Sequence, residues 1–452
     1  MKDEIKQTKM AIQLSDHFNY RRLFRFTLPS IVMMVFTSVY GVVDGYFVSN
    51  YAGKTAFAAV NLIMPFIMIL GGMGFMIGTG GTALVAKTMG EGDVKKANRY
   101  FSMMVSFTLV LGAVLTVLGI VFIEPVSRLL KASEEMLPSC ITYGRIVIGS
   151  TIPFMLQNVF QSFLIAAERP KLGLAVTLAA GIANMVLDYL FVGVFGWGVA
   201  GAAIATAVSE CVGGFVPFIY FLCPNKSILR LTWAKPEVTP ILQSVWNGSS
   251  ELMSNISASA ISIIYNFQLL KYFGENGVSA YGVLMYVQFI FNAISIGYSV
   301  GSAPIISYHY GAENHGELKN MLKKSTVLTA VSGVVLAGLA FSLAPILAKI
   351  FVGYDPDLFD LTKGAFRLFS ASFILTGFNI FSSSFFTALN DGFVSAAISF
   401  LRTLLFQTLS VMLLPLILGV NGIWLAKAAA EVLTLAVSLV FFFWKREKYK
   451  YF

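Results

Sequence analysis

Charged residues are scarce in this sequence. Only 12% of its 452 residues are Asp, Glu, Lys or Arg, whereas 57% are hydrophobic. Soluble proteins carry about 25% charged residues, and the mean hydropathy here is +0.76. Length alone would suggest about two or three soluble domains. Because apolar runs recur from end to end, the composition instead predicts one polytopic membrane protein.

Other absences exclude whole classes of chemistry. The three cysteines lie in or beside apolar runs without CxxC spacing, which excludes a disulfide framework and a cysteine metal site. The three histidines have no metal-ligand spacing. No Gly-rich loop ends in the lysine of an ATP site, and no nucleophile stands beside a catalytic acid in a known motif. We therefore expect no cofactor and no enzymatic activity.

Twelve apolar runs are long enough to cross a bilayer, which takes about 20 residues in a helix. The N-terminus lacks the apolar region of a signal peptide, so we expect the first span to remain in the mature protein. The sequence thus predicts an all-α protein with twelve transmembrane helices. They cover about residues 23–49, 55–82, 101–123, 141–166, 172–194, 199–223, 240–272, 278–306, 325–350, 365–388, 394–418 and 421–444.

The basic residues indicate an orientation. Most of the 32 Lys and Arg residues lie in the two termini and in the loops that follow spans 2, 4, 6 and 8. The positive-inside rule then predicts cytoplasmic termini and a multi-pass protein of the cell (inner or plasma) membrane. The net charge of +9 is thereby assigned to the inner leaflet. The lipid bilayer is an expected partner, nucleic acid is not, and we expect a monomer.

A repeat divides the chain into two halves. Gly90-Glu-Gly-Asp93 aligns with Gly311-Ala-Glu-Asn314 at an offset of 221 residues, and the same offset relates Glu210 to Glu431. Six spans separate the copies, so the halves are parallel repeats, an arrangement common in secondary transporters. The predicted parts are an N-terminal segment (1–22), an N-lobe (23–223), a linker (224–239), a C-lobe (240–444) and a tail (445–452).

The first span carries an unusual acid. Asp44 lies within the apolar stretch 23–53 without a basic residue near it, and Pro29 lies near the start of the same helix. A central Asp costs about 2.5–3.5 kcal/mol on insertion scales, so such an acid indicates a functional site. The alternative interpretation is an Asp44 hydrated near the headgroups.

Spans 5 and 6 add polar groups at a similar depth. Asn184 and Asp188 are four residues apart and share one helix face. Trp197 marks a tight hairpin, and Asp188 and Thr206 lie about 13 Å in from it at ~1.5 Å per residue. Two acids, an amide and a hydroxyl suit a proton relay, because adjacent carboxylates resist joint ionisation. They equally suit a hard monovalent cation, and a simple Asp–Asn packing contact is the third interpretation.

The chain resembles the multidrug and toxic compound extrusion (MATE) family over nearly its whole length. The resemblance is carried by Leu28-Pro29-Ser30, Tyr40-Gly-Val-Val-Asp44, the 90–93 loop, Asn184-Met-Val-Leu-Asp188, Gly196-Trp-Gly-Val-Ala-Gly201 and Asn390-Asp-Gly392. It implies a V-shaped pair of six-helix lobes that alternate between outward and inward openings. It also implies export of amphipathic, often cationic drugs against incoming H⁺ or Na⁺.

The resemblance also implies site residues. Pro29 matches a proline whose bend is proposed to respond to protonation. The NorM-like branch uses acids in spans 7 and 10, but here Glu251 lies early in span 7 and span 10 has no acid. This departure favours coupling in the N-lobe and a DinF-like pattern. The matching coupling residues, with H⁺ or Na⁺ as the ion, are Tyr40, Asp44, Gln157, Asn158, Asn184, Asp188 and Thr206.

Several further residues have two interpretations each. Glu251 and Glu210 are candidates for contact with substrate, or for structural ion pairs. Arg402 could pair with Glu431 or Glu251, and Lys427 with Glu431 four residues on. Methionines suit an adaptable substrate cleft, although packing is their commoner role. The methionines considered for the cleft are Met33, Met34, Met64, Met253 and Met285.

Two other functions compete with drug export. A flippase for lipid-linked precursors would need a basic cleft for phosphates, and only Arg402 and Lys427 lie more than five residues inside a span. A membrane receptor or scaffold would transport nothing, so substitution of Asp44 or Asp188 would leave efflux unchanged.

Overall fold

The computed structural model describes residues 12–452. The first eleven residues, with Lys2, Lys6 and Lys9 of the predicted basic N-terminal segment, lie outside this range. Nine helices in the described chain are long and apolar enough to cross a membrane, or eleven when two bent pairs each count as one span. One of the eleven, α9, holds two spans, because Gly274 breaks it with a φ of +62°. The twelve-span prediction is therefore confirmed.

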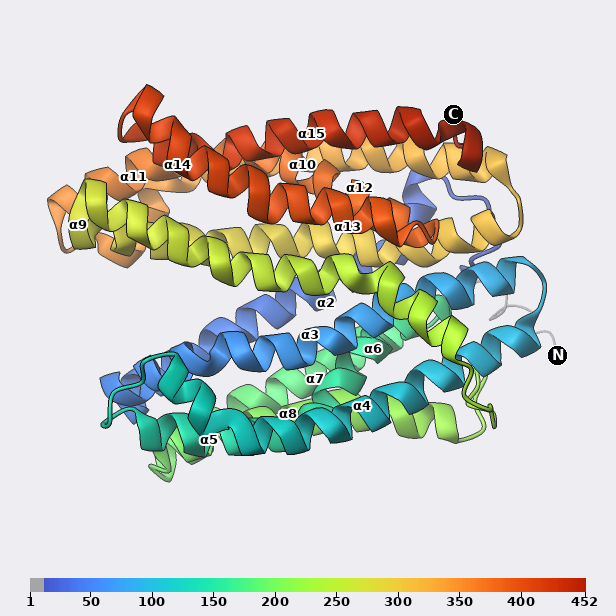
Figure 1. The fold of residues 1–452 in the computed structure, drawn as a ribbon, viewed down its shortest axis with the longest axis horizontal. Helices are drawn as coiled ribbons and strands as arrows, with labels where there is room; N and C mark the ends of the chain where they lie inside the picture. Colours follow the sequence, from blue (N-terminus) through green and yellow to red (C-terminus); the bar gives the residue numbers. More distant parts are fainter. Residues whose placement is uncertain (1–11) are drawn as a thin grey trace.

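The first lobe contains six spans (Figure 1). Span 4 is the pair α5–α6, which is bent by 55°. The elements are α2 (Tyr20–Phe47) with the π-helix η1 (Val48–Ala52), α3 (Lys54–Gly90), α4 (Val94–Leu129), α5 (Leu137–Gly149), α6 (Thr151–Ala166), α7 (Pro170–Asp188) with the π-helix η2 (Tyr189–Val194), and α8 (Gly198–Leu222).

The second lobe repeats this plan. Span 10, the pair α11–α12, is bent by 48°, at the position that the 221-residue offset assigns to the bend of span 4. The elements are α9 (Val238–Gly311), α10 (His315–Val352), α11 (Pro356–Ser370), α12 (Phe373–Ala388), α13 (Gly392–Phe400) with the π-helix η3 (Leu401–Phe406), α14 (Gln407–Leu418) and α15 (Asn421–Tyr449).

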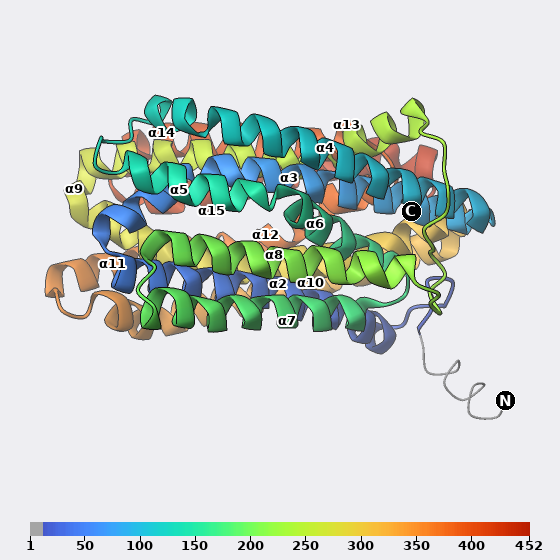
Figure 2. The ribbon, with the colours of Figure 1, turned by 90° about the horizontal axis from the view of Figure 1, so that it is seen from below.

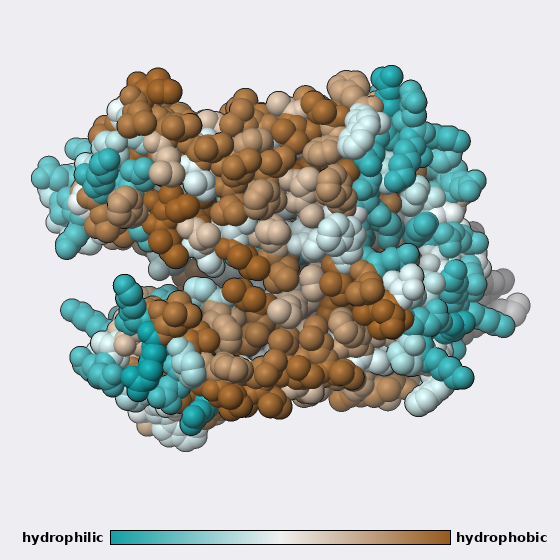
Figure 3. All heavy atoms as spheres, viewed as in Figure 1, coloured by the Kyte–Doolittle hydropathy of each residue, from teal (hydrophilic) through white to brown (hydrophobic). Residues whose placement is uncertain are grey.

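The lobes meet at one end of the molecule and separate at the other. One buried apolar cluster contains residues of both lobes, whereas each lobe has a further cluster of its own. Figure 3 shows a hollow between the lobes on the left and a closed hydrophilic face on the right. We call the closed end, which carries the C-terminus and the 91–93 and 312–314 turns, the basic end, and the other the open end. The predicted V shape is thus confirmed.

Two glycines hold the helices together at the basic end. A Cβ added at Gly90 of α3 would lie 2.0 Å from the carbonyl oxygen of Tyr308 in α9. A Cβ added at Gly311 would lie 1.9 Å from the carbonyl oxygen of Lys87. These contacts exchange under the 221-residue offset, because residue 87 corresponds to 308 and residue 90 to 311. The backbones of the two repeats therefore touch where only glycine fits.

Several helices are longer than the membrane spans predicted for them, and capping residues mark where they begin. Asp93 accepts a hydrogen bond from the Lys96 backbone N–H (2.9 Å) and begins α4. Its repeat partner Asn314 accepts from the Glu317 N–H (3.1 Å) and begins α10. The helices extend past the predicted spans, which end at residue 82 and begin at residue 325, because each helix continues beyond the apolar run until a capping side chain or turn stops it.

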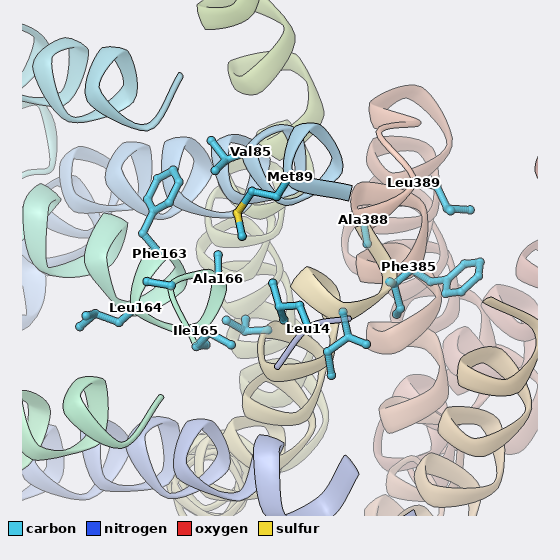
Figure 4. Packing of buried hydrophobic residues seen from close by; sticks show 14 of the residues in the cluster. Leu14, Val85, Met89, Phe163, Leu164, Ile165, Ala166, Phe385, Ala388 and Leu389 are labelled. Atoms are coloured by element: carbon cyan, nitrogen blue, oxygen red, sulfur yellow. The ribbon is translucent and has the colours of Figure 1, made fainter. Parts of the chain in front are cut away.

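A short N-terminal segment bridges the lobes at the basic end. Leu14 is fully buried between N-lobe residues such as Met89 and C-lobe residues such as Phe385 (Figure 4). Its backbone N–H donates to Glu168 Oε1 of the N-lobe (2.8 Å). The Phe18 N–H donates to Glu317 Oε1 of the C-lobe (2.9 Å). We call residues 12–19 the strap.

Candidate functional site

A cavity of about 330 Å³ opens between the lobes and extends into the N-lobe. Its walls come from α2, α3, α5, α6, α7 and α8, with Asn255 and Ile296 of α9 as the contribution of the C-lobe. Figure 2 shows α7 and α8 side by side with α2 behind them, and contacts join α7 to both. Six of the seven residues expected for ion coupling line this cavity: Tyr40, Asp44, Gln157, Asn158, Asn184 and Thr206.

The seventh, Asp188, lies behind the wall. It is 0% exposed and ends α7, and its carboxyl group lies beside that of Asp44, which is 8% exposed. Within residues 12–452, Asp44 Oδ1 and both carboxylate oxygens of Asp188 have no hydrogen-bonding partner. Burying ionised carboxylates without a partner is very costly, so this pair requires a proton or a cation.

Local helix geometry positions the two acids. The π-helix η2 begins at the residue after Asp188, and η1 begins four residues after Asp44. The wider π turn rotates the chain that follows and is frequent at functional sites. In α7, Asn184 lies one turn before Asp188, and its Oδ1 also has no partner in the described chain. Amide and carboxylate oxygens therefore converge on one face of α7.

The other expected residues form the wall around the pair. The Asn158 side chain donates to the Gly71 carbonyl oxygen (3.1 Å), which leaves its own oxygen available. Gln157 packs against α8, where a Cβ added at Gly213 would lie 2.4 Å from Gln157 Oε1. Glycine at this position therefore makes room for the amide.

A third acid faces the same cavity. Glu210 of α8 is 7% exposed and accepts a hydrogen bond from the Ser150 hydroxyl (2.5 Å). Ser150 is the residue at the bend between α5 and α6. No three of the His, Cys, Asp and Glu residues in the described chain are close enough to share a metal ion. The Glu210 carboxyl group is thus separate from the pair Asp44–Asp188.

Sequence reasoning left Glu210 out of the coupling set and did not find Ser150. A signal for Glu210 existed, because it follows Thr206 by four residues and so shares its helix face. Ser150 had no such signal, since its contact with α8 spans 60 residues.

The cavity lining includes only some of the residues expected for the substrate cleft. Met64 lines the cavity, but Met33 is 1% exposed and packs in the core, whereas its neighbour Met34 lines the wall. Adjacent residues on a helix point about 100° apart, and hydropathy does not distinguish them. Met253, Met285 and Glu251 also lie outside this cavity, and Met285 packs against the apolar cluster of the C-lobe. Pro29 is buried within α2, which stays helical through it.

The two basic residues deep inside the C-lobe, Arg402 and Lys427, have polar partners. Arg402 donates to both oxygens of Glu431, with its NH2 group 2.9 Å from Oε1. Asn379 donates to Glu431 Oε2 (2.7 Å), so this carboxylate is held on several sides. Lys427 is 2.5 Å from Gln288 Oε1 and lies 5.1 Å from the Phe369 ring centroid. The structure therefore selects the Arg402–Glu431 pair over the alternatives.

The fold and the cavity together define a two-lobe membrane transporter. Residues 29–190 and 252–412 match the MatE family model. The chain therefore belongs to the MATE family.

Individual relatives agree with this assignment. The multidrug export protein MepA of Staphylococcus saprophyticus is 22% identical over 429 residues, covering 93% of both chains. A MATE crystal structure in the straight conformation superposes with a TM-score of 0.90, at 21% identity and over 98% of both chains. A MATE structure in the bent conformation gives 0.84, at 22% identity and over 95% of both chains.

Proposed function

We propose that this protein is a secondary active multidrug exporter that exchanges amphipathic, cationic compounds for H⁺ or Na⁺. One observation carries the proposal: two adjacent carboxyl groups, Asp44 and Asp188, are buried without a partner beside a cavity between two lobes. The name of the relative MepA, a multidrug export protein, supports the same function.

The buried pair explains coupling by charge balance. Two carboxylates at close range in low dielectric cannot both stay ionised unless a cation joins them. A proton shared by Asp44 and Asp188 satisfies this requirement. A sodium ion does so too, with the unpartnered oxygen of Asn184 and the hydroxyl of Thr206 as further ligands. In our proposal either ion binds from the open end and is released after the lobes reverse.

The cavity favours a cationic, partly apolar substrate. Its lining contains the aromatic rings of Tyr40, Tyr143 and Phe154 and the thioethers of Met34 and Met64. Aromatic faces attract cations, and methionines adapt to ligands of different shape. Asp44 and Glu210 supply negative charge, and the lining includes no Lys or Arg. This polarity argues against the phosphate-binding cleft that a lipid-linked precursor flippase would need.

We further propose that the basic end faces the cytoplasm of a cell membrane and that one chain is the functional unit. The positive-inside rule supports this orientation. The cavity supports the second point, because both lobes of one chain contribute to its wall. The Pro29 helix, continuous here, is then the element that bends when the ion binds.

The experiment uses the purified protein in proteoliposomes loaded with a fluorescent cationic dye. A proton gradient and a sodium gradient are imposed separately. We expect one of them to drive dye movement against its concentration gradient. Failure of both gradients would contradict coupled export and favour a receptor or scaffold. Movement of a lipid-linked phosphate analogue in place of the dye would favour the flippase.

A further inference from the structure

A second cavity, of about 450 Å³, lies on the flank of the C-lobe. It is formed by α10, α12, α15 and the residues after α15, near the basic end. In Figure 1 these helices lie at the top, on the side of the C-lobe away from the N-lobe. This furrow therefore faces the surrounding membrane and is separate from the cavity between the lobes.

The walls of the furrow are mostly apolar. They include Leu322, Phe378, Leu439 and Phe442, and of these Phe442 is 2% exposed. The furrow has no acidic side chain in its lining. Such a surface suits a hydrocarbon chain and disfavours a cation.

The chain after α15 folds back to close one side of the furrow. Lys450 adopts a left-handed conformation (φ +53°), which reverses the backbone. The Tyr451 hydroxyl then donates to the Phe442 carbonyl oxygen (3.0 Å). The Phe452 ring stacks on Phe443 with centroids 5.9 Å apart. Tyr451 and Phe452 therefore form a defined aromatic wall along one side of the furrow.

Two lysines stand at the furrow on one face of α10. Lys319 and Lys323 are one helical turn apart, and both line the furrow and are exposed. Their neighbours are engaged, because Lys324 donates to the Phe18 carbonyl oxygen and Lys445 pairs with Asp391. Lys319 and Lys323 form no ion pair among residues 12–452. They therefore offer two uncompensated positive charges next to an apolar groove.

We propose that this furrow is a binding site for an anionic phospholipid. The phosphate lies between the ammonium groups of Lys319 and Lys323, and an acyl chain lies along Phe378 and Phe442. The charge pattern supports a lipid over a neutral apolar ligand, because basic pockets between membrane helices at the headgroup level select anionic lipids. The apolar length of the furrow supports a lipid over a free anion.

The test is native mass spectrometry of the full-length protein released from nanodiscs that contain equal amounts of phosphatidylglycerol and phosphatidylcholine. We expect the wild type to retain phosphatidylglycerol preferentially. The double variant Lys319→Gln/Lys323→Gln should lose this preference by about tenfold or more, because each lysine contributes to attraction of an anionic lipid. A matched control, Lys349→Gln/Lys363→Gln at the open end of the C-lobe, should retain it.

Further arms separate the sources of the signal. Phe443→Ala, which removes the ring on which Phe452 of the aromatic wall stacks, should weaken retention of phosphatidylglycerol while the lysines remain. Inorganic phosphate should not displace the lipid. Equal retention of both lipids by the wild type, unchanged retention by the double lysine variant, or displacement by inorganic phosphate would each overturn the proposal.

Discussion

At the scale of single residues, the two lobes differ in the partners that their buried charged groups have. In the C-lobe, Glu431 is held by Arg402, and Lys427 rests on Gln288 and an aromatic ring. In the N-lobe, Asp44 and Asp188 have carboxylate oxygens without partners in the described chain. A buried ion pair with satisfied partners can be purely structural, whereas buried carboxylates without partners mark a candidate functional site. This difference favours the N-lobe as the place of ion coupling.

Glu210 should determine affinity for cationic substrates without carrying the coupling ion. Glu210→Gln keeps the size of the side chain and removes its charge. Because hydrogen bonds to charged groups contribute about 1.5–3 kcal/mol, the substrate concentration for half-maximal transport should rise at least about tenfold. The measurement is dye transport at varied dye concentration. Ion movement through Asp44 should persist, and equal loss of both activities would contradict a substrate-only role.

Asp391, at the basic end outside the spans, predicts a pH dependence of stability. Partial burial raises its pKa, but the Tyr449 hydroxyl (2.7 Å) and the Lys445 ammonium (3.0 Å) outweigh burial and hold the pKa below the usual 3.8. A lowered folded-state pKa stabilises the fold above about pH 4. This contribution is lost as the pH falls through the lowered pKa.

The test is Asp391→Asn in thermal or denaturant unfolding. At pH 7 the variant should lose about 1.5–3 kcal/mol. Its deficit should stay constant down to about pH 4 and shrink below that pH, where the wild-type carboxylate becomes protonated. The exposed Asp357→Asn is the control and should show a small, constant effect. A deficit that grows on acidification would contradict the sign of the shift.

Residues of the site could be predicted from the sequence only where helical spacing relates them to one another. Asn184 and Asp188 were found by their four-residue spacing, and the structure brings Asn184 and Thr206 to one cavity. Met33 and Met34 could not be told apart from the sequence, because hydropathy does not fix the rotation of an apolar helix. The Ser150–Glu210 contact was missed because it depends on the bend of span 4 and on packing across 60 residues.

At the scale of elements, irregular segments lie next to the functional groups. The π-helices η1 and η2 follow Asp44 and Asp188, and η3 contains Arg402. The bends of spans 4 and 10 occupy equivalent positions in the two repeats. Apolar run length predicted the twelve spans, but a run of apolar residues does not distinguish α from π turns. These local features therefore had to come from the structure.

The glycine contacts between α3 and α9 should control closure of the basic end. Gly90→Ala or Gly311→Ala places a methyl group about 2 Å from a backbone oxygen, which the helices can relieve only by separating. Overpacking typically costs about 1–3 kcal/mol. We therefore expect thiol labelling of a buried reporter, Thr82→Cys in a cysteine-free background, to accelerate about tenfold.

The control for this experiment is Gly338→Ala in α10. A Cβ there meets nothing within 4 Å, so labelling should stay at the wild-type rate. If Gly90→Ala labels no faster than Gly338→Ala, the α3–α9 contact does not limit opening.

At the scale of the whole molecule, the structure is open at one end and closed at the other. The shared apolar cluster and the strap close the basic end, whereas separate clusters leave the lobes apart at the open end. The two-lobe fold could be predicted from the 221-residue repeat, since parallel repeats dictate similar halves. The strap could not, because a polar N-terminal stretch carries no signal of its partners across 154 and 299 residues.

The strap should stabilise closure of the basic end. Glu317 accepts from the Phe18 N–H and lies 2.7 Å from His17 Nδ1, so Glu317→Gln removes the charge that holds the strap to the C-lobe. We expect spin labels at Lys95→Cys and Lys323→Cys to show a larger population of long distances in this variant. Asp360→Asn at the open end is the control. An unchanged distance distribution would show that the strap does not contribute to closure.

The central claim is that Asp44 and Asp188 together bind the coupling ion. The most direct measurement is dye accumulation in proteoliposomes under the gradient that drives the wild type, with dye binding measured on the same preparations. We predict that Asp44→Asn and Asp188→Asn each abolish gradient-driven accumulation, that both still bind dye through the cavity with Glu210, and that Asp360→Asn behaves as the wild type. Gradient-driven accumulation retained in both Asp44→Asn and Asp188→Asn would contradict the claim.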